Sequence, residues 1–425
     1  MKTKNNYMKS IALIVICILV ITSVFCFYGC KPEYTIQATN LMEGITPNSV
    51  SLLEDLSMGR PAITDFAVKL FKASNEEGKN ILISPLSVLC ALAMTANGAA
   101  GETLTQMESV FGMSMEEINH YLYSYMKSLP EGDKYKLSLA NSIWFTEDER
   151  FTVKRELLQN NADYYGADVY KAPFDETTLK DINHWVNDKT DGMIPKILDY
   201  IQPKAVMYLI NALAFEAEWV KVYEKHQVKD GKFTKEDGTK QDVEFMYSLE
   251  SCYLEDEKAS GFIKYYAGQK YAFAAILPSE GISISEYIAS LDGNSLKTLL
   301  TNVQNMSLKV AIPKFETEYA VEISKTLSDL GMSDAFSPEE ANFKNLGTST
   351  EGNLYISNVF HKTYISVGEK GTKAGAATAV VMEPTSGGPD FEPKQIYLDR
   401  PFVYMLIDCE NNIPFFIGTM MDINQ

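Results

Sequence analysis

One long connection near the C-terminus constrains the fold more than any other feature of the sequence. Residues 369–400 separate two segments with strand patterns, 355–367 and 402–407, and contain three Pro residues. Connections longer than about 12 to 15 residues are usually functional or disordered. By composition alone, the Gly- and Ala-rich first part is typical of a flexible linker. The connection is therefore either a linker or a functional loop.

The first half of this connection also alternates with a period of two. The charged Lys373 falls on one side of the alternation, and the other side holds only uncharged, mostly small residues. A segment with this pattern can enter a β-sheet as a strand with one face buried and Lys373 in solvent. The uncharged side consists of Thr372, Ala374, Ala376, Thr378, Val380 and Met382.

The rest of the chain predicts an α+β layout, with helices early and strands dominating late. Ser84 followed by Pro85 is typical of a helix start, and this helix is expected to end at Asn97 and Gly98. The nearly continuous apolar run 206–215 predicts a central strand covered on both faces. Other expected elements are strands over 137–145, 308–312 and 355–367, helices over 180–191 and 321–330, and a hairpin joining 402–407 to 414–420.

The N-terminal residues have the pattern of an export signal. Lys2, Lys4 and Lys9 precede an uncharged apolar run over 11–28, as in secretory signal peptides. The run ends in the letters FYGC, which resemble a bacterial lipoprotein cleavage box and predict lipidation of Cys30. An uncleaved membrane helix and plain secretion stay open as alternatives. All three place the body outside the cytoplasm, and we expect an extracellular protein anchored to the membrane as a lipoprotein.

Charge and cysteine content narrow the function classes. Removing residues 1–29, which hold three Lys and no acid, from 38 Lys+Arg and 56 Asp+Glu leaves 35 positive and 56 negative side chains, a net charge of -21. This negative excess argues against nucleic acid as a partner. Beyond Cys30 only Cys90, Cys252 and Cys409 remain. Their odd number and wide spacing predict neither a disulfide framework nor a metal site, and we expect no cofactor.

The length alone, at roughly 150 residues per domain, suggests two or three domains. The segments just described change that expectation. Residues 1–29 are assigned to a signal peptide and residues 30–58 to an anchor and spacer. One large domain, 59–425, then remains.

Several ordered motifs resemble those of the serpins, across most of the chain from about Pro61 to Met420. A single motif would be weak, whereas the whole series in this order is strong. The motifs are NILISPLS at 80–87, MTANGAAG at 94–101, Asn211-Ala212 with Phe215 and Trp219, PKF at 313–315, NVFHK at 358–362 and EKGTKAGAAT at 369–378.

The resemblance implies a fold with three β-sheets, about nine helices and an exposed reactive loop over about 369–400. In serpins a protease cleaves this loop as a substrate and stays acylated to it. The hinge of the loop then inserts as a new strand into the main sheet, and the protease active site is distorted. Fifteen inserting residues span about 50 Å at about 3.3 Å each, enough to carry an attached enzyme across such a domain. The resemblance thus implies a monomeric suicide-substrate inhibitor of an extracellular serine protease rather than an enzyme.

The family's spacing places the scissile bond between Thr385 and Ser386, with cleavage after Met382 or after Ser386 as alternatives. No Arg or Lys lies between Lys373 and Lys394, which argues against a trypsin-like target and favours an elastase-like or subtilisin-like one.

The resemblance also implies two further sets of residues. The breach is an ion pair with an adjacent Trp at the top of the insertion site, and the shutter is a hydrogen-bonded network beneath the main sheet. The assigned residues are Gly371, Thr372, Lys373, Ala374, Gly375, Ala376, Ala377 and Thr378 in the hinge, Glu369, Lys314 and Trp219 in the breach, and Ser84, Ser87, Asn211 and His361 in the shutter.

Two other classes of function compete with inhibition. A hydrolase is disfavoured because the sequence has no G-x-S-x-G elbow and no H-E-x-x-H helix. A non-inhibitory serpin that acts as a surface binding module is the second alternative. Such a module does not need the uncharged alternation in the hinge, so the sequence favours an inhibitor.

Overall fold

The fold is described from a computed structural model, which covers residues 34–147, 151–202, 205–350, 353–372 and 392–425. Residues Gln37–Gln425 form one compact unit. The predicted signal peptide, Cys30, the hinge residues after Thr372 and the predicted scissile bond all lie outside the described residues. Among the described residues, no helix is both long and apolar enough to cross a membrane.

The main sheet has seven strands within the described residues, and its central strand is the apolar one that the sequence predicts. This strand, β6, is buried over residues 207–215 because both faces of the sheet are covered. The observed strand thus confirms the predicted central strand. In spatial order the sheet consists of β1 (Thr39–Asn40), β5 (Asp168–Ala172), β3 (Tyr135–Thr146), β6 (Met207–Glu218), β15 (Gly371–Thr372), β14 (Asn358–Gly368) and β12 (Phe315–Glu322).

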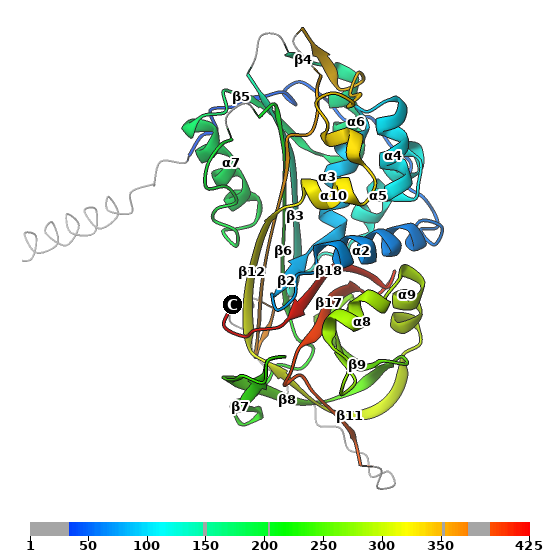
Figure 1. Cartoon of the computed structure of the whole chain (residues 1–425), viewed down its shortest axis with the longest axis vertical. Coiled ribbons are helices and arrows are strands. Elements are labelled where there is room, and N and C mark those ends of the chain that lie inside the picture. Colours follow the sequence, from blue (N-terminus) through cyan, green and yellow to red (C-terminus); the bar gives the residue numbers. More distant parts are fainter. Residues whose placement is uncertain (1–33, 148–150, 203–204, 351–352, 373–391) are drawn as a thin grey trace, which may run out of the picture. The chain divides into compact units, whose positions relative to one another are not determined.

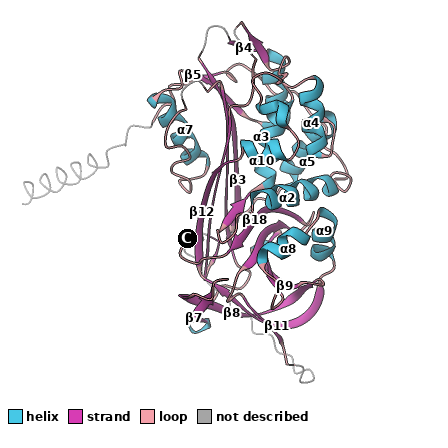
Figure 2. Ribbon diagram, viewed as in Figure 1, coloured by secondary structure: helices cyan, strands magenta, loops and turns pink. Residues whose placement is uncertain are grey.

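A second sheet contains the predicted C-terminal hairpin, formed by β17 (Phe402–Asp408) and β18 (Ile413–Met420); in the view of Figure 2, β18 lies between α2 and α8. Both hairpin strands are buried along their whole length, as the sequence predicts. In the described part of the chain, the spatial order of this second sheet is β16 (Lys394–Tyr397), β11 (Gln304–Pro313), β8 (Lys240–Glu255), β9 (Ala259–Tyr265), β10 (Tyr271–Pro278), β17 (Phe402–Asp408), β18 (Ile413–Met420) and β2 (Ile81–Ile83), and β7 (Val228–Thr234) pairs with β8. A third sheet has two strands, β4 (Phe151–Val153) and β13 (Gly347–Ser349).

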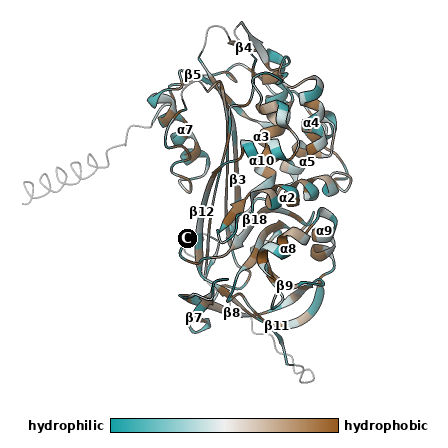
Figure 3. Cartoon of the chain, viewed as in Figure 1, coloured by the Kyte–Doolittle hydropathy of each residue, from teal (hydrophilic) through white to brown (hydrophobic). Residues whose placement is uncertain are grey.

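Nine α-helices occur in the described ranges, so the α+β fold with three sheets agrees with the expectation. In Figure 1, α7 lies on the opposite side of the main sheet from α3. Figure 3 shows hydrophobic residues concentrated around β18 and the neighbouring inner strands, which belong to one continuous core. The helices are α2 (Arg60–Ser74), α3 (Pro85–Ala96), α4 (Gly101–Phe111), α5 (Met115–Ser128), α6 (Arg155–Tyr165), α7 (Glu176–Lys189), α8 (Ile284–Ser290), α9 (Gly293–Thr301) and α10 (Ser324–Asp329).

Helix α3 begins as the sequence predicts. Ser84 is the N-cap, and its side chain accepts a hydrogen bond from the backbone N–H of Ser87, while Pro85 occupies the first turn. The helix ends before Asn97. All of its residues are buried, so α3 forms part of the core beneath the main sheet.

Several predicted boundaries differ from the structure. The helix expected over 180–191 spans Glu176–Lys189, and the strand expected over 355–367 spans Asn358–Gly368. The helix expected over 321–330 begins only at Ser324, because Val321 and Glu322 continue the strand pairing of β12 with β14; tertiary pairing overrides the local helical period here. The spacer expected over 30–58 contacts the body from Gln37 onward. The backbone N–H groups of Gln37 and Ala38 donate to Oδ2 of Asp181 at 3.0 and 2.8 Å.

Candidate functional site

The predicted reactive loop begins as a two-residue strand inside the main sheet. In β15, Thr372 pairs with Ala217 of β6 and Val367 of β14. Farther along the same two strands, β6 and β14 pair directly with each other in parallel, over 208–214 and 358–364. The centre of the sheet is therefore closed, while the start of an additional strand already lies between β6 and β14 at one end.

Gly371 is required at the entry point. Its φ angle is +151°, and a Cβ atom added there would lie 1.9 Å from the backbone oxygen of Ala217. Any other residue would collide with the backbone of β6 at this close approach. The close approach of β6 therefore requires glycine as the first residue of the predicted hinge.

Thr372 is buried, and its hydroxyl forms a hydrogen bond with an aromatic residue of the core. Its Oγ1 lies 2.6 Å from the hydroxyl of Tyr266, and burial raises the pKa of Tyr266 so that this hydroxyl stays protonated. The Tyr266 ring stacks on Trp219 with 4.4 Å between centroids and 7° between planes. The side chain of the hinge thus points into the core, onto an aromatic pair that includes the predicted Trp219.

The segment that follows β6 holds the base of the loop by its backbone carbonyls. Trp219 Nε1 donates to the oxygen of Gly368 at 2.9 Å. The backbone N–H of Trp219 donates to the oxygen of Lys370 at 2.8 Å, and that of Tyr223 to the oxygen of Glu369 at 2.9 Å. Three consecutive carbonyls of the turn between β14 and β15 are therefore bound by residues 219–223, which we call the clamp segment.

The predicted ion pair of the breach is formed. Nζ of Lys314 lies 2.8 Å from Oε1 of Glu369 and also 2.8 Å from Oε2 of Glu244. The hydrogen bonds that Lys314 donates to Glu244 and Glu369 raise the pKa of Lys314, and the same bond to Glu369 lowers the pKa of that carboxyl. The structure thus brings together Lys314, Glu369 and Trp219, and adds Glu244 as a second carboxylate.

The shutter residues form a hydrogen-bonded row beneath the main sheet. The backbone N–H of Ser84 donates to Nε2 of His361 at 3.0 Å, so Nδ1 carries the ring proton and donates to Oδ1 of Asn211. Nδ2 of Asn211 then donates to Oδ1 of Asn141 at 2.6 Å. Burial lowers the pKa of His361 to about 3, so the ring is neutral and the direction of each hydrogen bond is fixed.

Ser87 contributes to the shutter through its backbone. Its N–H donates to Oγ of Ser84 at 3.3 Å, whereas its own hydroxyl has no hydrogen-bond partner among the described residues. Thr363 adds a bond that the sequence did not predict, from its Oγ1 to the backbone oxygen of Leu82 at 2.7 Å. These contacts join α3 and β2 to the underside of β14.

Asn141, Tyr223, Glu244 and Tyr266 were missed from the sequence. Asn141 had a signal, since a polar residue interrupts the apolar alternation of its strand, and it pairs directly opposite Asn211. The other three belong to segments far from the loop in sequence, and only the fold brings them to its base. Lys373 to Thr378, Thr385 and Ser386 lie outside the described residues.

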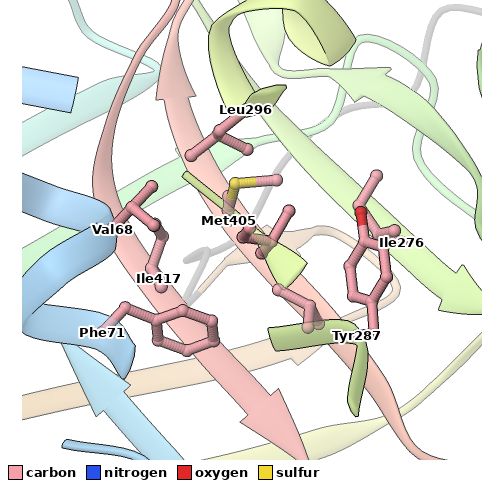
Figure 4. A pocket seen from close by; sticks show the side chains of 9 residues that line it. Val68, Phe71, Ile276, Tyr287, Leu296, Met405 and Ile417 are labelled. Atoms are coloured by element: carbon pink, nitrogen blue, oxygen red, sulfur yellow. The ribbon is translucent and has the colours of Figure 1, made fainter. Parts of the chain in front are cut away.

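A small pocket lies away from this site, between α2, α9 and the strands of the second sheet (Figure 4). Its volume is about 10 Å³, close to the minimum that holds one water molecule. It is lined by apolar side chains, among them Val68, Phe71 and Met405. This space is a gap in core packing rather than a site for an organic ligand.

The site thus consists of a main sheet that is closed along its centre and of a connection whose first residues enter that sheet as a strand at one end. A family model described as Serpin (serine protease inhibitor) matches residues 61–423. An uncharacterised serpin-like protein of Thermococcus kodakarensis is 30% identical over 369 residues, which cover 85% of each chain. The chain belongs to the serpin family.

Solved structures support the same assignment. The native-state crystal structure of tengpin, a thermophilic serpin, has 50% sequence identity and a TM-score of 0.87, and the match covers 91% of this chain and all of that one. The latent-state structure of tengpin matches with 46% identity and a TM-score of 0.76, over 89% of this chain and all of that one. The structure described above is thus more similar to the native than to the latent form.

Proposed function

We propose that the protein inhibits serine proteases as a suicide substrate. A target protease cleaves the reactive loop near Thr385 and Ser386 and is held as an acyl-enzyme while the loop inserts between β6 and β14. The observation that carries this proposal is β15, whose two residues already occupy the start of the insertion site. The serpin family supports protease inhibition in general terms.

The register of β15 supports the length of the proposed strand. Because β15 runs antiparallel to β6, each further loop residue would face the preceding residue of β6. Ten residues beyond Thr372 lead to Met382, and ten residues before Ala217 lead to Met207, where β6 begins. The uncharged alternation in the sequence also ends at Met382, so its length matches the strand that would receive it.

The orientation of Thr372 supports the proposed inward face. Its side chain points to Tyr266 in the core, and in a strand every second residue points to the same face. Ala374, Ala376 and Thr378 would then be buried, and Lys373 would face solvent. Insertion replaces one ladder between β6 and β14 by two. At about 1 kcal/mol net per bond, ten added bonds with burial of apolar side chains contribute on the order of 10 kcal/mol.

The proposed target class is an elastase-like or subtilisin-like protease. A small uncharged residue such as Thr385 suits a shallow specificity pocket, and cleavage after Met382 or after Ser386 would also suit uncharged pockets. The acidic residues Glu383, Asp390 and Glu392 favour encounter with a basic protease, an effect that added salt is expected to weaken.

The proposed location is the outer face of a cell membrane, with a lipid on Cys30 as the anchor. The body is proposed to be a monomer in this state. Metabolic labelling with a fatty acid tests the anchor directly. Wild-type protein is expected to take up the label and partition into detergent, and Cys30→Ser is expected to lose both properties. A label retained by Cys30→Ser would contradict the assignment.

A matched pair of hinge variants tests the proposed inhibition. Thr378→Glu places a charge on the proposed inward face, so the cleaved loop would insert slowly and the variant is expected to be cut as an ordinary substrate. Lys373→Glu places the same charge on the outward face and is expected to keep forming a covalent adduct with elastase. Equal behaviour of the two variants would contradict insertion along the proposed register.

A further inference from the structure

Lys264, on β9, lies buried beside the residues that hold the base of the reactive loop. Its side chain is only 3% exposed, and its Nζ lies 2.7 Å from Oε1 of Glu250 on β8, which is itself 16% exposed. Removing an ammonium group from water is costly. A lysine in this position must therefore be stabilised by the groups around it.

Two aromatic rings provide part of that stabilisation. Nζ of Lys264 lies 4.6 Å from the ring centroid of Tyr223 and 5.4 Å from that of Trp219. Cations within about 6 Å of an aromatic face are attracted to it, more strongly where water is excluded. Burial acts to lower the pKa of Lys264, but Tyr223 and Glu250 outweigh it and raise the pKa overall. The ammonium is therefore charged.

Both rings belong to the clamp segment, at its two ends. The backbone N–H groups of Trp219 and Tyr223 donate to the carbonyls of Lys370 and Glu369. The clamp segment is also tied to the end of β9, because the N–H of Val220 donates to the oxygen of Tyr265 at 3.1 Å. Lys264 thus joins the second sheet to both residues that hold the loop base.

Packing alone does not explain this charged pair. Buried ion pairs are often replaced by apolar residues of similar volume without loss of stability. The pair also borders an open cavity of about 350 Å³ that is lined by Val220, Leu249 and both charged residues. An apolar side chain of similar size would therefore pack equally well at this position. The charge of Lys264 matters for its contacts with Trp219 and Tyr223 of the clamp segment.

We propose that Lys264 is a positioning residue for loop insertion, which fixes Trp219 and Tyr223 and so restrains the ends of β6 and β14. The effect on loop insertion rests on the proposed function, whereas the contacts of Lys264 do not. Insertion of further residues requires the two strands to move apart by about 4.8 Å, the spacing of one strand. Because β15 already separates the ends of the two strands, this movement concerns residues 208–214 and 358–364, where they still pair directly. The bond from Trp219 to Gly368 spans the separated ends and restrains them from moving farther apart.

The test compares variants by the rate at which uncleaved protein converts, on warming, to a form resistant to urea unfolding. Such conversion reports loop insertion and requires no inhibition of any protease. Lys264→Met keeps most of the side-chain volume and removes the charge, and is expected to convert at least about tenfold faster than wild type. Lys264→Arg keeps the charge and is expected to convert at nearly the wild-type rate.

Two further variants separate positioning from general destabilisation. Lys235→Met breaks another ion pair, 2.8 Å from Asp422, without touching the clamp segment, and is expected to leave conversion unchanged. Glu250→Gln keeps the ammonium between the rings and is expected to convert more slowly than Lys264→Met. If Lys264→Met does not fold, Lys264→Gln replaces it.

Two results would overturn the proposal: a neutral Lys264 variant that converts at the wild-type rate, or Lys235→Met accelerating conversion as much as the Lys264 variants do. Adduct formation with elastase is measured in parallel. If wild type forms no adduct but the neutral Lys264 variants convert faster, the proposed inhibition fails while the role of Lys264 stands.

Discussion

The ammonium of Lys314 lies 2.8 Å from the carboxylate of Glu369, and this pair links the two large sheets at the base of the reactive loop. Lys314 directly follows β11 of the second sheet, whereas Glu369 directly follows β14 of the main sheet. The pair therefore restrains the turn from which the loop enters between β6 and β14.

Glu369→Lys is expected to release this turn. The substitution removes the pair and places a second ammonium beside Lys314, so the loop would insert prematurely or the protein would polymerise. Both residues are about a third exposed, so the lost pair itself is worth at most about 1 kcal/mol, and repulsion adds to the effect. We expect a lower thermal transition for the native form whose loop has not inserted, and a polymer ladder on native gels.

Glu244→Lys is the matched control for that prediction. Glu244 accepts from the same Lys314 at the same distance, 2.8 Å, but it does not belong to the loop. Glu244→Lys is expected to lose its ion pair with Lys314 in the same way, but to form no polymer on native gels. Polymer formation by both variants alike would show that charge at Lys314, rather than release of Glu369, is responsible.

Gly371→Ala is expected to destabilise the native form by about 2 kcal/mol or more. The new Cβ would lie 1.9 Å from the backbone oxygen of Ala217, so β15 would be displaced from β6. Gly368→Ala is the control, because nothing lies within 4 Å of its added Cβ. Urea unfolding measures both, and an equal midpoint for the two variants would contradict the close approach.

The buried His361 is expected to make stability fall in acid. Burial lowers its pKa from an ordinary 6.5 to about 3, so between these values the unfolded chain binds a proton that the native chain does not. Stability is therefore full above about pH 6.5 and declines as the pH falls toward 3, by about 1.4 kcal/mol per unit.

His361→Asn is expected to remove that slope, as measured by urea unfolding at several pH values between 4 and 7. The exposed His226→Asn is expected to keep it. A wild-type slope that persists in His361→Asn would assign the acid sensitivity to other groups.

The bond between Tyr266 and Thr372 is suited to a double-mutant cycle. Tyr266→Phe leaves the buried Thr372 hydroxyl unpaired and is expected to cost about 1 to 3 kcal/mol. Thr372→Val is expected to cost a similar amount, and the double variant less than the sum. Strict additivity in thermal unfolding would mean that the 2.6 Å contact contributes nothing.

Local pattern was sufficient to predict several elements of the fold. The apolar run of β6 and the cap of α3 are properties of adjacent residues. The serpin motifs paired Lys314 with Glu369 and Asn211 with His361, and these residues are in contact in the structure. The strand and the cap could be predicted because burial and capping depend on only a few neighbouring residues.

Contacts between distant segments could not be predicted in this way. Tyr266 reaches Thr372 across 106 residues of sequence, and nothing in its local pattern indicates that neighbour. The same holds for Gln37 and Ala38, whose backbone N–H groups donate to Asp181 although the polar composition of their segment predicted only a spacer. Tertiary pairing, rather than propensity, decides these positions.

The most direct test of the account is incubation of the protein with elastase and with subtilisin, followed by denaturing gel electrophoresis and mass spectrometry. The account predicts an SDS-resistant adduct with at least one of them, together with a chain cleaved near Thr385 and Ser386. Trypsin, which needs Arg or Lys, is expected to form none at this loop. Cleavage of the loop with no adduct from either enzyme would contradict inhibition and favour a non-inhibitory binding module.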